Sequence, residues 1–274
     1  MDQDQELQRR LAEATATVDR LQTQAEKQRR SIEGWKKELG ATRNSVWDPL
    51  PGLQLLDRVE QVIDQVVSER LSLLDQRHLR VLARQVLHAD QTGRQGLIIE
   101  AGTARGGSAI AMAAAKDPAR PMRVYDVFGQ IPAPGEQDGK DVHDRYQVIA
   151  SGQARGAGGG VYYGYRDELY AEVTDSFARL GVAVGPNNVA LIQGLFEDTI
   201  AVDEPVAFAH IDGDWYESTM TCLERIAPRL VRGGRLVLDD YFHWSGCRKA
   251  VDEYFADRPD FVLERRKKLH VVRV

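Results

Sequence analysis

The sequence is poor in cysteine and has no long apolar run. Only two cysteines, Cys222 and Cys247, occur among 274 residues, too few for a disulfide-rich scaffold or a closed cysteine zinc site. No apolar stretch approaches the ~18 residues of a transmembrane helix, and the first residues, MDQDQELQRR, are unlike a signal peptide. These absences predict a soluble, cytoplasmic protein that does not insert into membranes.

The sequence also has fewer basic than acidic residues. The chain holds 36 Lys and Arg against 41 Asp and Glu, a net charge of −5, which argues against a broadly basic nucleic-acid-binding surface. Residues 1–40 contain eight acidic and eight basic side chains, so the whole acidic excess belongs to residues 41–274. A hydrophobic content of 43% suits a sizeable core, and the length suits one large α/β domain with an appendage.

A heptad pattern occupies the first 40 residues. Its apolar positions recur at alternating spacings of four and three residues, with one polar member, Gln28: Leu7, Leu11, Ala14, Val18, Leu21, Ala25, Gln28, Ile32, Trp35 and Leu39. Such a repeat keeps one stripe of a helix against a neighbouring helix. We therefore expect residues 1–43 to form a coiled-coil helix that makes the protein a homo-oligomer. A helix folded back on the same chain, or one that docks another protein, remains an alternative.

Residues 44–95 are predicted to be a linker followed by a helical cap. The stretch from Asn44 to Gly52 contains two prolines and a glycine, which are typical of a linker. Apolar residues at helical spacing over 53–89 then predict two or three helices that cover the next domain.

Short apolar runs separated by helix-like stretches begin at residue 96. The candidate strands are Leu97–Ala101, Arg123–Val127, Val189–Gln193, Val206–Asp212 and Arg235–Asp239, with a final pair near Phe261–Glu264 and Leu269–Val274. This alternation predicts an α/β domain over 96–274 with a doubly wound, mostly parallel sheet of about seven strands. Because such sheets bind ligands at the carboxyl ends of their strands, we expect the functional residues there.

A glycine-rich turn follows the first predicted strand. Glycines 102, 106 and 107 in the segment from Glu100 to Ser108 permit a tight turn and close approach of a ligand to the backbone. The spacing is not the dinucleotide fingerprint, because position 104 is alanine. Asp126 ends the second run, 24 residues beyond Gly102, where a carboxylate can accept ribose hydroxyls. The pattern predicts an adenosine-containing cofactor.

The residues after the third strand are candidates for the adenine contact. These are Gly194, Leu195 and Phe196. An ordinary strand-to-helix turn is the alternative interpretation.

Four aspartates follow two predicted neighbouring strands. Asp212 and Asp214 end one strand, and Asp239 and Asp240 end the next. Clustered carboxylates raise one another's pKa unless a cation neutralises them. Asp212, Asp239 and Asp240 suit Mg²⁺, while Asp214 is available to take a proton. Solvated strand-end aspartates and a structural Ca²⁺ site are the alternatives.

Taken together, these motifs resemble a known family. E-x-G-x-x-R-G-G-S, D-x-F-G, D-G-D-x-Y-x-S-T and G-G-x-x-x-x-D-D-Y are similar to motifs of the macrocin-type O-methyltransferases over about residues 66–260. Those enzymes use S-adenosylmethionine (SAM) and Mg²⁺ to methylate sugar hydroxyls in antibiotic biosynthesis. The resemblance implies the Rossmann-like class I SAM methyltransferase fold, Asp212, Asp239 and Asp240 as metal ligands, and Asp214 as general base. The implied cofactor contacts are Glu100, Gly102, Thr103, Ala104, Arg105, Gly106, Ser108, Asp126, Phe128, Gly194, Leu195 and Phe196.

A long segment, about residues 129–167, is predicted to be a lid over the acceptor. It contains a glycine run over 151–160 that the family pattern lacks, which leaves the identity of the acceptor open. The candidate acceptor contacts are Tyr163, Tyr165, Tyr241, His243 and Trp244. A surface loop with partly buried tyrosines, and a structural role for His243, are the alternatives. His210, on a predicted buried strand, is expected to be structural.

The predicted function is a SAM- and divalent-metal-dependent O-methyltransferase that methylates a sugar hydroxyl of a glycosylated natural product. A catechol or other phenolic diol, or a sugar of a surface polysaccharide, would present hydroxyls to the metal in the same way. A non-catalytic coiled-coil adaptor is the remote alternative, since it leaves the glycine turn and the four aspartates unexplained.

Overall fold

The computed structural model describes residue 15, residues 18–29 and residues 48–274. The chain divides into two compact units, Met1–Trp47 and Asp48–Val274. In the first unit residues 18–29 are helical, and the side chains of Val18 and Leu21 are exposed. This helix agrees with the heptad prediction where the two overlap, at Val18, Leu21, Ala25 and Gln28. The other heptad positions, Leu7, Leu11, Ala14, Ile32, Trp35 and Leu39, lie outside the described residues.

Seven strands of the second unit form one sheet in the order β3-β2-β1-β4-β5-β7-β6. Their bounds are β1 Leu97–Ala101, β2 Met122–Asp126, β3 Val189–Gln193, β4 Val206–Ile211, β5 Leu230–Leu238, β6 Phe261–Arg265 and β7 Leu269–Arg273. Strands β1 to β5 pair in parallel, whereas β7 is antiparallel to β5 and β6. The predicted doubly wound, mostly parallel sheet is therefore confirmed. The strand order reverses between β1 and β4, which opens a crevice at their carboxyl ends.

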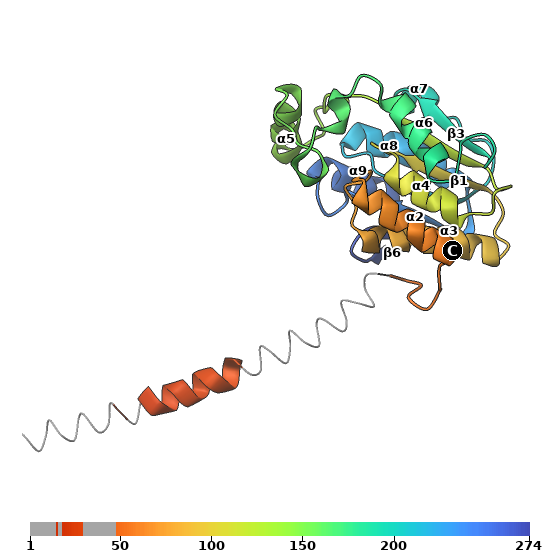
Figure 1. Ribbon diagram of the computed structural model, residues 1–274. Coiled ribbons are helices and arrows are strands. Elements are labelled where there is room, and N and C mark those ends of the chain that lie inside the picture. The colour runs from red at the N-terminus through yellow and green to blue at the C-terminus, as the bar shows by residue number, and fades with distance from the viewer. Residues whose placement is uncertain (1–14, 16–17, 30–47) are drawn as a thin grey trace, which may run out of the picture. The chain divides into compact units, whose positions relative to one another are not determined.

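Helices cover both faces of this sheet (Figure 1). The helices are α2 Asp57–Ser68, α3 Gln76–Gln91, α4 Gly107–Ala115, α5 Lys140–Ala150, α6 Leu169–Arg179, α7 Phe196–Thr199, α8 Tyr216–Ile226 and α9 Ser245–Phe255, with short 3-10 turns at Ala157–Gly159, Tyr163–Tyr165 and Ala227–Arg229. None of the helices in the described ranges is long and apolar enough to cross a membrane.

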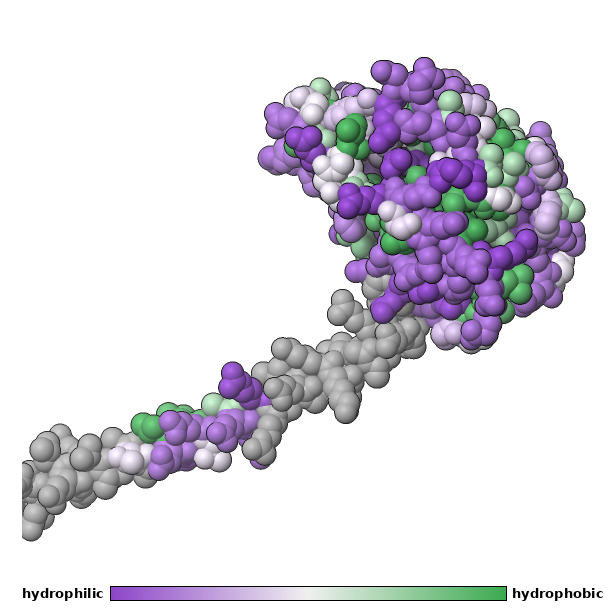
Figure 2. Space-filling model, viewed as in Figure 1, coloured by the Kyte–Doolittle hydropathy of each residue, from purple (hydrophilic) through white to green (hydrophobic). Residues whose placement is uncertain are grey.

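Two apolar cores lie on opposite faces of the sheet. Successive side chains of a strand point to opposite faces, so Ile98 packs with helices α2, α3, α4 and α6, whereas Leu97 and Ile99 pack with α8 and α9. Helices α2 and α3 therefore share a core with the sheet they were expected to cover. The face of residues 48–274 that Figure 2 shows is mostly hydrophilic, with apolar side chains in small patches.

The structure differs from the predicted elements in two places that matter here. Strand β5 begins at Leu230, five residues before its predicted start, because Gly233 (φ +73°) is accommodated within the strand and does not end it. The predicted lid contains helix α5, which sequence reasoning missed. Only Val142 and Ile149 of this helix are buried, so its apolar periodicity is weak.

Candidate active site

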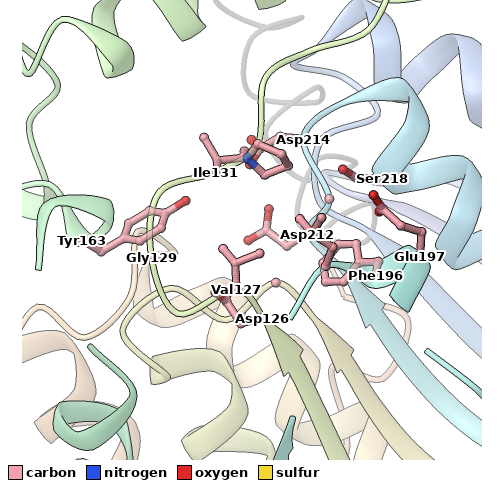
Figure 3. A pocket seen from close by; sticks show the side chains of 14 residues that line it. Asp126, Val127, Gly129, Ile131, Tyr163, Phe196, Glu197, Asp212, Asp214 and Ser218 are labelled. Carbon is pink, nitrogen blue, oxygen red and sulfur yellow. The ribbon is translucent and has the colours of Figure 1, made fainter. Parts of the chain in front are cut away.

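A cleft runs along the carboxyl ends of the central strands (Figure 3). Two adjoining parts of it share six lining residues, which are Gly102, Asp126, Ile131, Tyr163, Asp212 and Asp214. The predicted site residues that line it are Gly102, Thr103, Ala104, Ser108, Asp126, Tyr163, Leu195, Phe196, Asp212, Asp214, Asp239, Asp240, His243 and Trp244. The expectation that functional side chains gather at the strand ends is thus met by most of the candidates.

The turn after β1 requires glycine at position 102. Gly102 has φ +86°, and a Cβ there would lie 2.0 Å from the carbonyl oxygen of Asp212. The turn is fixed by the Asp126 carboxylate, which accepts hydrogen bonds from the backbone N–H groups of Thr103 (2.7 Å), Ala104 (3.0 Å) and Phe128 (2.7 Å). Burial raises the pKa of Asp126, and these three bonds oppose that rise. The carboxylate predicted to accept ribose hydroxyls therefore also organises the turn.

Five predicted cofactor residues shape these turns from behind the cleft. The buried Glu100 carboxylate bonds His210 and Thr103, and the Arg105 guanidinium donates to the carbonyl oxygens of Arg70 and Glu69. Phe128 is buried edge-on against Tyr170, with ring centroids 5.0 Å apart. Gly106 and Gly194 both have positive φ, and a side chain at either would meet a packed neighbour. The structure therefore brings the backbone of these turns to the cleft but not these side chains.

Three aspartates converge as a cluster in the cleft. Asp212, Asp214 and Asp240 offer carboxylate oxygens that all lie within 4.8 Å of one another. Burial, followed by the charge of the neighbouring carboxylates, raises the pKa of all three. Asp214 has φ +53°, and its carboxylate Oδ1 accepts a hydrogen bond of 3.0 Å from Trp244 Nε1. Among the described residues, no ion pair to a basic side chain offsets the mutual repulsion of these three carboxylates.

Asp239 faces a different set of partners from Asp240. Its Oδ2 lies 2.5 Å from Lys268 Nζ, and its Oδ1 lies 3.5 Å from His210 Nε2. Burial alone would raise the pKa of Asp239, but His210 and Lys268 hold it well below the usual value. Both aspartates line the cleft, but the Asp239 carboxylate is engaged by His210 and Lys268. Asp214, and not the predicted Asp239, therefore completes the compact carboxylate cluster.

Four acidic and basic side chains form a row that passes through Asp239, beside the aspartate cluster. Glu100 Oε1 lies 3.0 Å from His210 Nδ1, and the two residues are register partners on β1 and β4. Burial opposes protonation of His210, yet Asp239 and Glu100 together raise its pKa to about 9. Acidic and basic side chains therefore alternate along the row Glu100, His210, Asp239 and Lys268. His210 has the structural role that was predicted for it, whereas no sequence signal marked Lys268.

The part of the cleft that was predicted to receive the acceptor is aromatic. Tyr163 lies against Tyr162, with ring centroids 4.4 Å apart, and burial raises the pKa of Tyr163 well above its usual value. Trp215 and Trp244 meet edge-to-face at 5.8 Å. These rings form a surface on which a sugar or an aromatic ring can stack. In this part of the cleft the lining residues that the sequence did not indicate are Ser72, Leu73, Leu74, Ile131, Arg145, Ile149, Trp215 and Lys268.

Two predicted acceptor contacts lie away from the cleft. The Tyr165 hydroxyl donates to the carbonyl oxygen of Ile149 inside the lid. The Tyr241 side chain is buried; its hydroxyl donates to Asp252 and accepts from Arg265. Both tyrosines therefore stabilise structure around the cleft, because their hydroxyl groups are already held by protein partners.

Two aspartates of the segment predicted to be a lid bond to the helices that follow the two aspartate pairs. Asp138 Oδ1 accepts from the backbone N–H of Tyr216 at the start of α8 (2.9 Å), and Asp141 Oδ2 accepts from that of Ser245 at the start of α9 (2.9 Å). Carboxylates satisfy the free N–H groups of helix N-termini. Trp215 Nε1 also donates to the carbonyl oxygen of Pro132 (3.0 Å). The segment predicted to be a lid is therefore held against Trp215 and the starts of α8 and α9 by specific hydrogen bonds.

Comparison with known proteins places this fold and site in a family. Residues 70–259 match the family model described as macrocin-O-methyltransferase (TylF). The chain is 30% identical over 224 residues to the 8-demethyl-8-(2,3-dimethoxy-alpha-L-rhamnosyl)-tetracenomycin-C 4'-O-methyltransferase of Streptomyces olivaceus, covering 79% of this chain and 70% of that protein. It is 32% identical over 174 residues to the demethyldecarbamoylnovobiocin O-methyltransferase of Streptomyces niveus, covering 59% and 58%.

A solved structure shows the same fold. The O-methyltransferase NovP superposes with a TM-score of 0.64 at 24% sequence identity, covering 80% of this chain and 97% of that one. The family match spans most of the unit that carries the cleft. The chain belongs to the macrocin O-methyltransferase family and is an O-methyltransferase with the SAM-dependent methyltransferase fold.

Proposed function

We propose that this enzyme methylates a sugar hydroxyl of a glycosylated natural product and that a bound Mg²⁺ assists the reaction. The observation that carries this proposal is the cluster of Asp212, Asp214 and Asp240 in the same cleft as the Gly102 turn. A relative supports the sugar, since its name specifies a rhamnosyl group. The acceptor is the natural product's glycosyl unit, which the aromatic lid residues would hold.

The residues around the Gly102 turn fit SAM. A glycine with no side chain, beside the backbone of Thr103 and Ala104, leaves room for the amino-acid part of the cofactor. Asp126 lies between this turn and Leu195 and Phe196, so it would meet the ribose while the two apolar residues flank the adenine. When bound, SAM supplies a methyl group activated by a positively charged sulfur.

The carboxylates fit a hard divalent cation. Asp212 and Asp240 belong to the cluster, and burial together with mutual repulsion raises their pKa values. Asp239 lines the cleft, and its Oδ1 is buried without a hydrogen-bond partner. We assign Mg²⁺ to Asp212, Asp239 and Asp240, with Asp214 left as the base. When bound, the cation lowers the pKa of a hydroxyl that it contacts.

Asp214 would accept the proton of the sugar hydroxyl. A sugar hydroxyl has a pKa far above 7, so its oxygen attacks a methyl group readily only when a base removes its proton. Trp244 holds Oδ1 of Asp214 and thereby orients the carboxylate. The lid residues Ile131 and Tyr163 border the same space and would exclude water while the methyl group is transferred.

An acceptor screen tests this function. With labelled SAM and Mg²⁺, we expect methyl transfer to rhamnosylated and other glycosylated aromatic compounds, loss of transfer in EDTA, and recovery when Mg²⁺ is restored. Simple catechols, as matched diols, are expected to react poorly. Preferred methylation of catechols, or of polysaccharide, would contradict the proposed acceptor, and EDTA-resistant transfer would contradict the metal. Failure to bind S-adenosylhomocysteine would contradict catalysis itself.

We also propose that residues 1–40 make the enzyme a homo-oligomer. Support comes from the heptad pattern and from the helix over 18–29, on which Val18 and Leu21 are 50% and 56% exposed. Removing residues 1–40 is expected to reduce the mass in solution to that of one chain, measured by light scattering after size-exclusion chromatography. An unchanged mass would show that these residues do not carry the association.

A further inference from the structure

Arg145 occupies an unusual place on helix α5. Val142 and Ile149 are the buried residues of this helix, and they lie three positions before and four positions after Arg145. Residues at these spacings share one face of a helix. Arg145 is therefore a charged residue on the inward face, and it lines the cleft beside Ile149 and Tyr162.

No carboxylate pairs with Arg145 within residues 48–274. Lys268, the other strongly basic side chain in the cleft lining, is bound to Asp239. The acidic residues of α5 are also committed elsewhere, because Asp141 accepts from Ser245 and Asp144 pairs with Lys140. The contact made by the Arg145 guanidinium is with the Tyr162 ring, whose centroid lies 5.9 Å from Cζ. Its donors are thus available to a ligand.

The charges opposite Arg145 are those of the aspartate cluster. Arg145 opposes the rise in the pKa of Asp214, although the two side chains form no ion pair. In the proposed function the aspartates serve the cation and the acceptor's proton, so they do not consume the hydrogen-bonding capacity of the guanidinium. A planar guanidinium with free donors is suited to two parallel hydrogen bonds with a carboxylate or phosphate.

We propose that Arg145 forms an anion subsite that reads an oxyanion on the acceptor, either the carboxylate of an acidic sugar or the phosphate of a sugar nucleotide. The inference rests on the proposed transfer of a methyl group to a sugar hydroxyl, and it specifies an anionic group on the molecule that carries this sugar. The sugar would stack near Tyr162 and Tyr163, and its anionic group would lie at the α5 side of the cleft. Neutral glycosides would leave the guanidinium without a partner.

Binding of matched probes tests this subsite. The full chain, loaded with S-adenosylhomocysteine and Mg²⁺, is titrated with 4-nitrophenyl glucuronide, with 4-nitrophenyl glucoside, and with UDP-glucose. The first two differ by a single carboxylate, and the third presents phosphate. We expect an anionic probe to bind more tightly than the glucoside. Arg145→Gln should lower the affinity for that anionic probe by about 10-fold or more. Which anionic probe responds identifies the source of the oxyanion.

Two further variants control this experiment. Lys140→Gln removes the same charge from α5 at a side chain that is 85% exposed, and it should leave all affinities unchanged. Arg145→Lys keeps the charge but cannot donate two parallel hydrogen bonds, so it should lower the affinity for the anionic probe by less than Arg145→Gln does. It also serves as the test variant if Arg145→Gln unfolds.

Three results would overturn the anion subsite. The first is that neither anionic probe binds at millimolar concentration, and the second is that all three probes bind equally. The third is that Arg145→Gln binds the anionic probe as tightly as the native enzyme does, which would mean that the metal binds the anion. Affinity for S-adenosylhomocysteine distinguishes a failure of the proposed function from a failure of the anion subsite. If the cofactor product fails to bind the unmodified enzyme, the proposed function is wrong; if it binds and charge selectivity is absent, only this inference is wrong.

Discussion

Replacement of Asp214 by asparagine is expected to lower the turnover number by ~10²- to 10⁴-fold, the range that a positioned general base contributes. Asparagine has nearly the same shape and keeps an oxygen that can accept from Trp244 Nε1, a bond of 3.0 Å in the native enzyme. It cannot take the proton of the acceptor hydroxyl. The affinity for S-adenosylhomocysteine should therefore stay unchanged while the rate falls. Steady-state methyl transfer and calorimetric titration measure the two quantities separately.

The Trp244→Phe variant is the natural companion to Asp214→Asn. Phenylalanine removes the donor that orients Asp214 but leaves the carboxylate in place, so the turnover number should fall less than in Asp214→Asn. Retention of full turnover by Asp214→Asn would exclude Asp214 as the base. A fall in Trp244→Phe as large as that in Asp214→Asn would instead show that orientation matters as much as proton transfer.

Replacing either Asp212 or Asp240 by asparagine is expected to weaken Mg²⁺ binding by at least the ~10- to 100-fold that loss of an outer-shell partner costs. Both carboxylates belong to the compact cluster, and each supplies an anionic oxygen that an amide cannot replace in charge. Calorimetric titration of the variants with Mg²⁺ measures the effect directly. Asp203→Asn is the matched control, since the Asp203 side chain is 95% exposed. If both Asp212→Asn and Asp240→Asn bound Mg²⁺ with the native affinity, the proposed metal site would be wrong.

The same titration decides the third ligand. Our assignment gives that role to Asp239, so Asp239→Asn should weaken Mg²⁺ binding while Asp214→Asn should not. The geometry also offers the opposite arrangement, because Asp214 lies within the 4.8 Å cluster and Asp239 is paired with Lys268. Loss of Mg²⁺ affinity in Asp214→Asn, with native affinity in Asp239→Asn, would transfer the ligand role to Asp214. The fall in turnover expected of Asp214→Asn would then have a second cause.

Strand positions could be predicted well from the sequence, because burial on both faces leaves an uninterrupted apolar run. Leu97–Ala101, in which all five residues are buried, agrees with the structure at both ends. Val189–Gln193 also agrees at both ends, although only Val189 of this edge strand is buried. The start of β5 was missed because two adjacent glycines are as typical of a turn as of an irregular strand. Helix α5 was missed because few of its residues are buried. Local pattern is informative where burial is regular and weak where it is not.

For the polar residues of the site, the sequence predicted their location but not their contacts. Their positions along the chain placed Asp126, Asp212 and Asp240 at strand ends, and the structure brings all three to the cleft. Position alone did not reveal that Glu100 faces His210, because that contact joins residues 110 positions apart. The partners of Tyr241 were hidden for a similar reason. The direction in which a side chain points after a strand has ended depends on the geometry of the turn and on side chains from distant segments.

The amino-acid sequence by itself determined the class of fold, the order of the motifs and the family, since these depend on periodicity and spacing. Only the tertiary structure decided which aspartates face one another. Asp214 enters the cluster through its left-handed backbone, and Lys268 reaches Asp239 from the end of the chain. It also turned Arg145 toward the cleft, because Val142 and Ile149 fix the buried face of α5. Ion pairs and burial across distant segments, which no local pattern records, set the chemistry of this site.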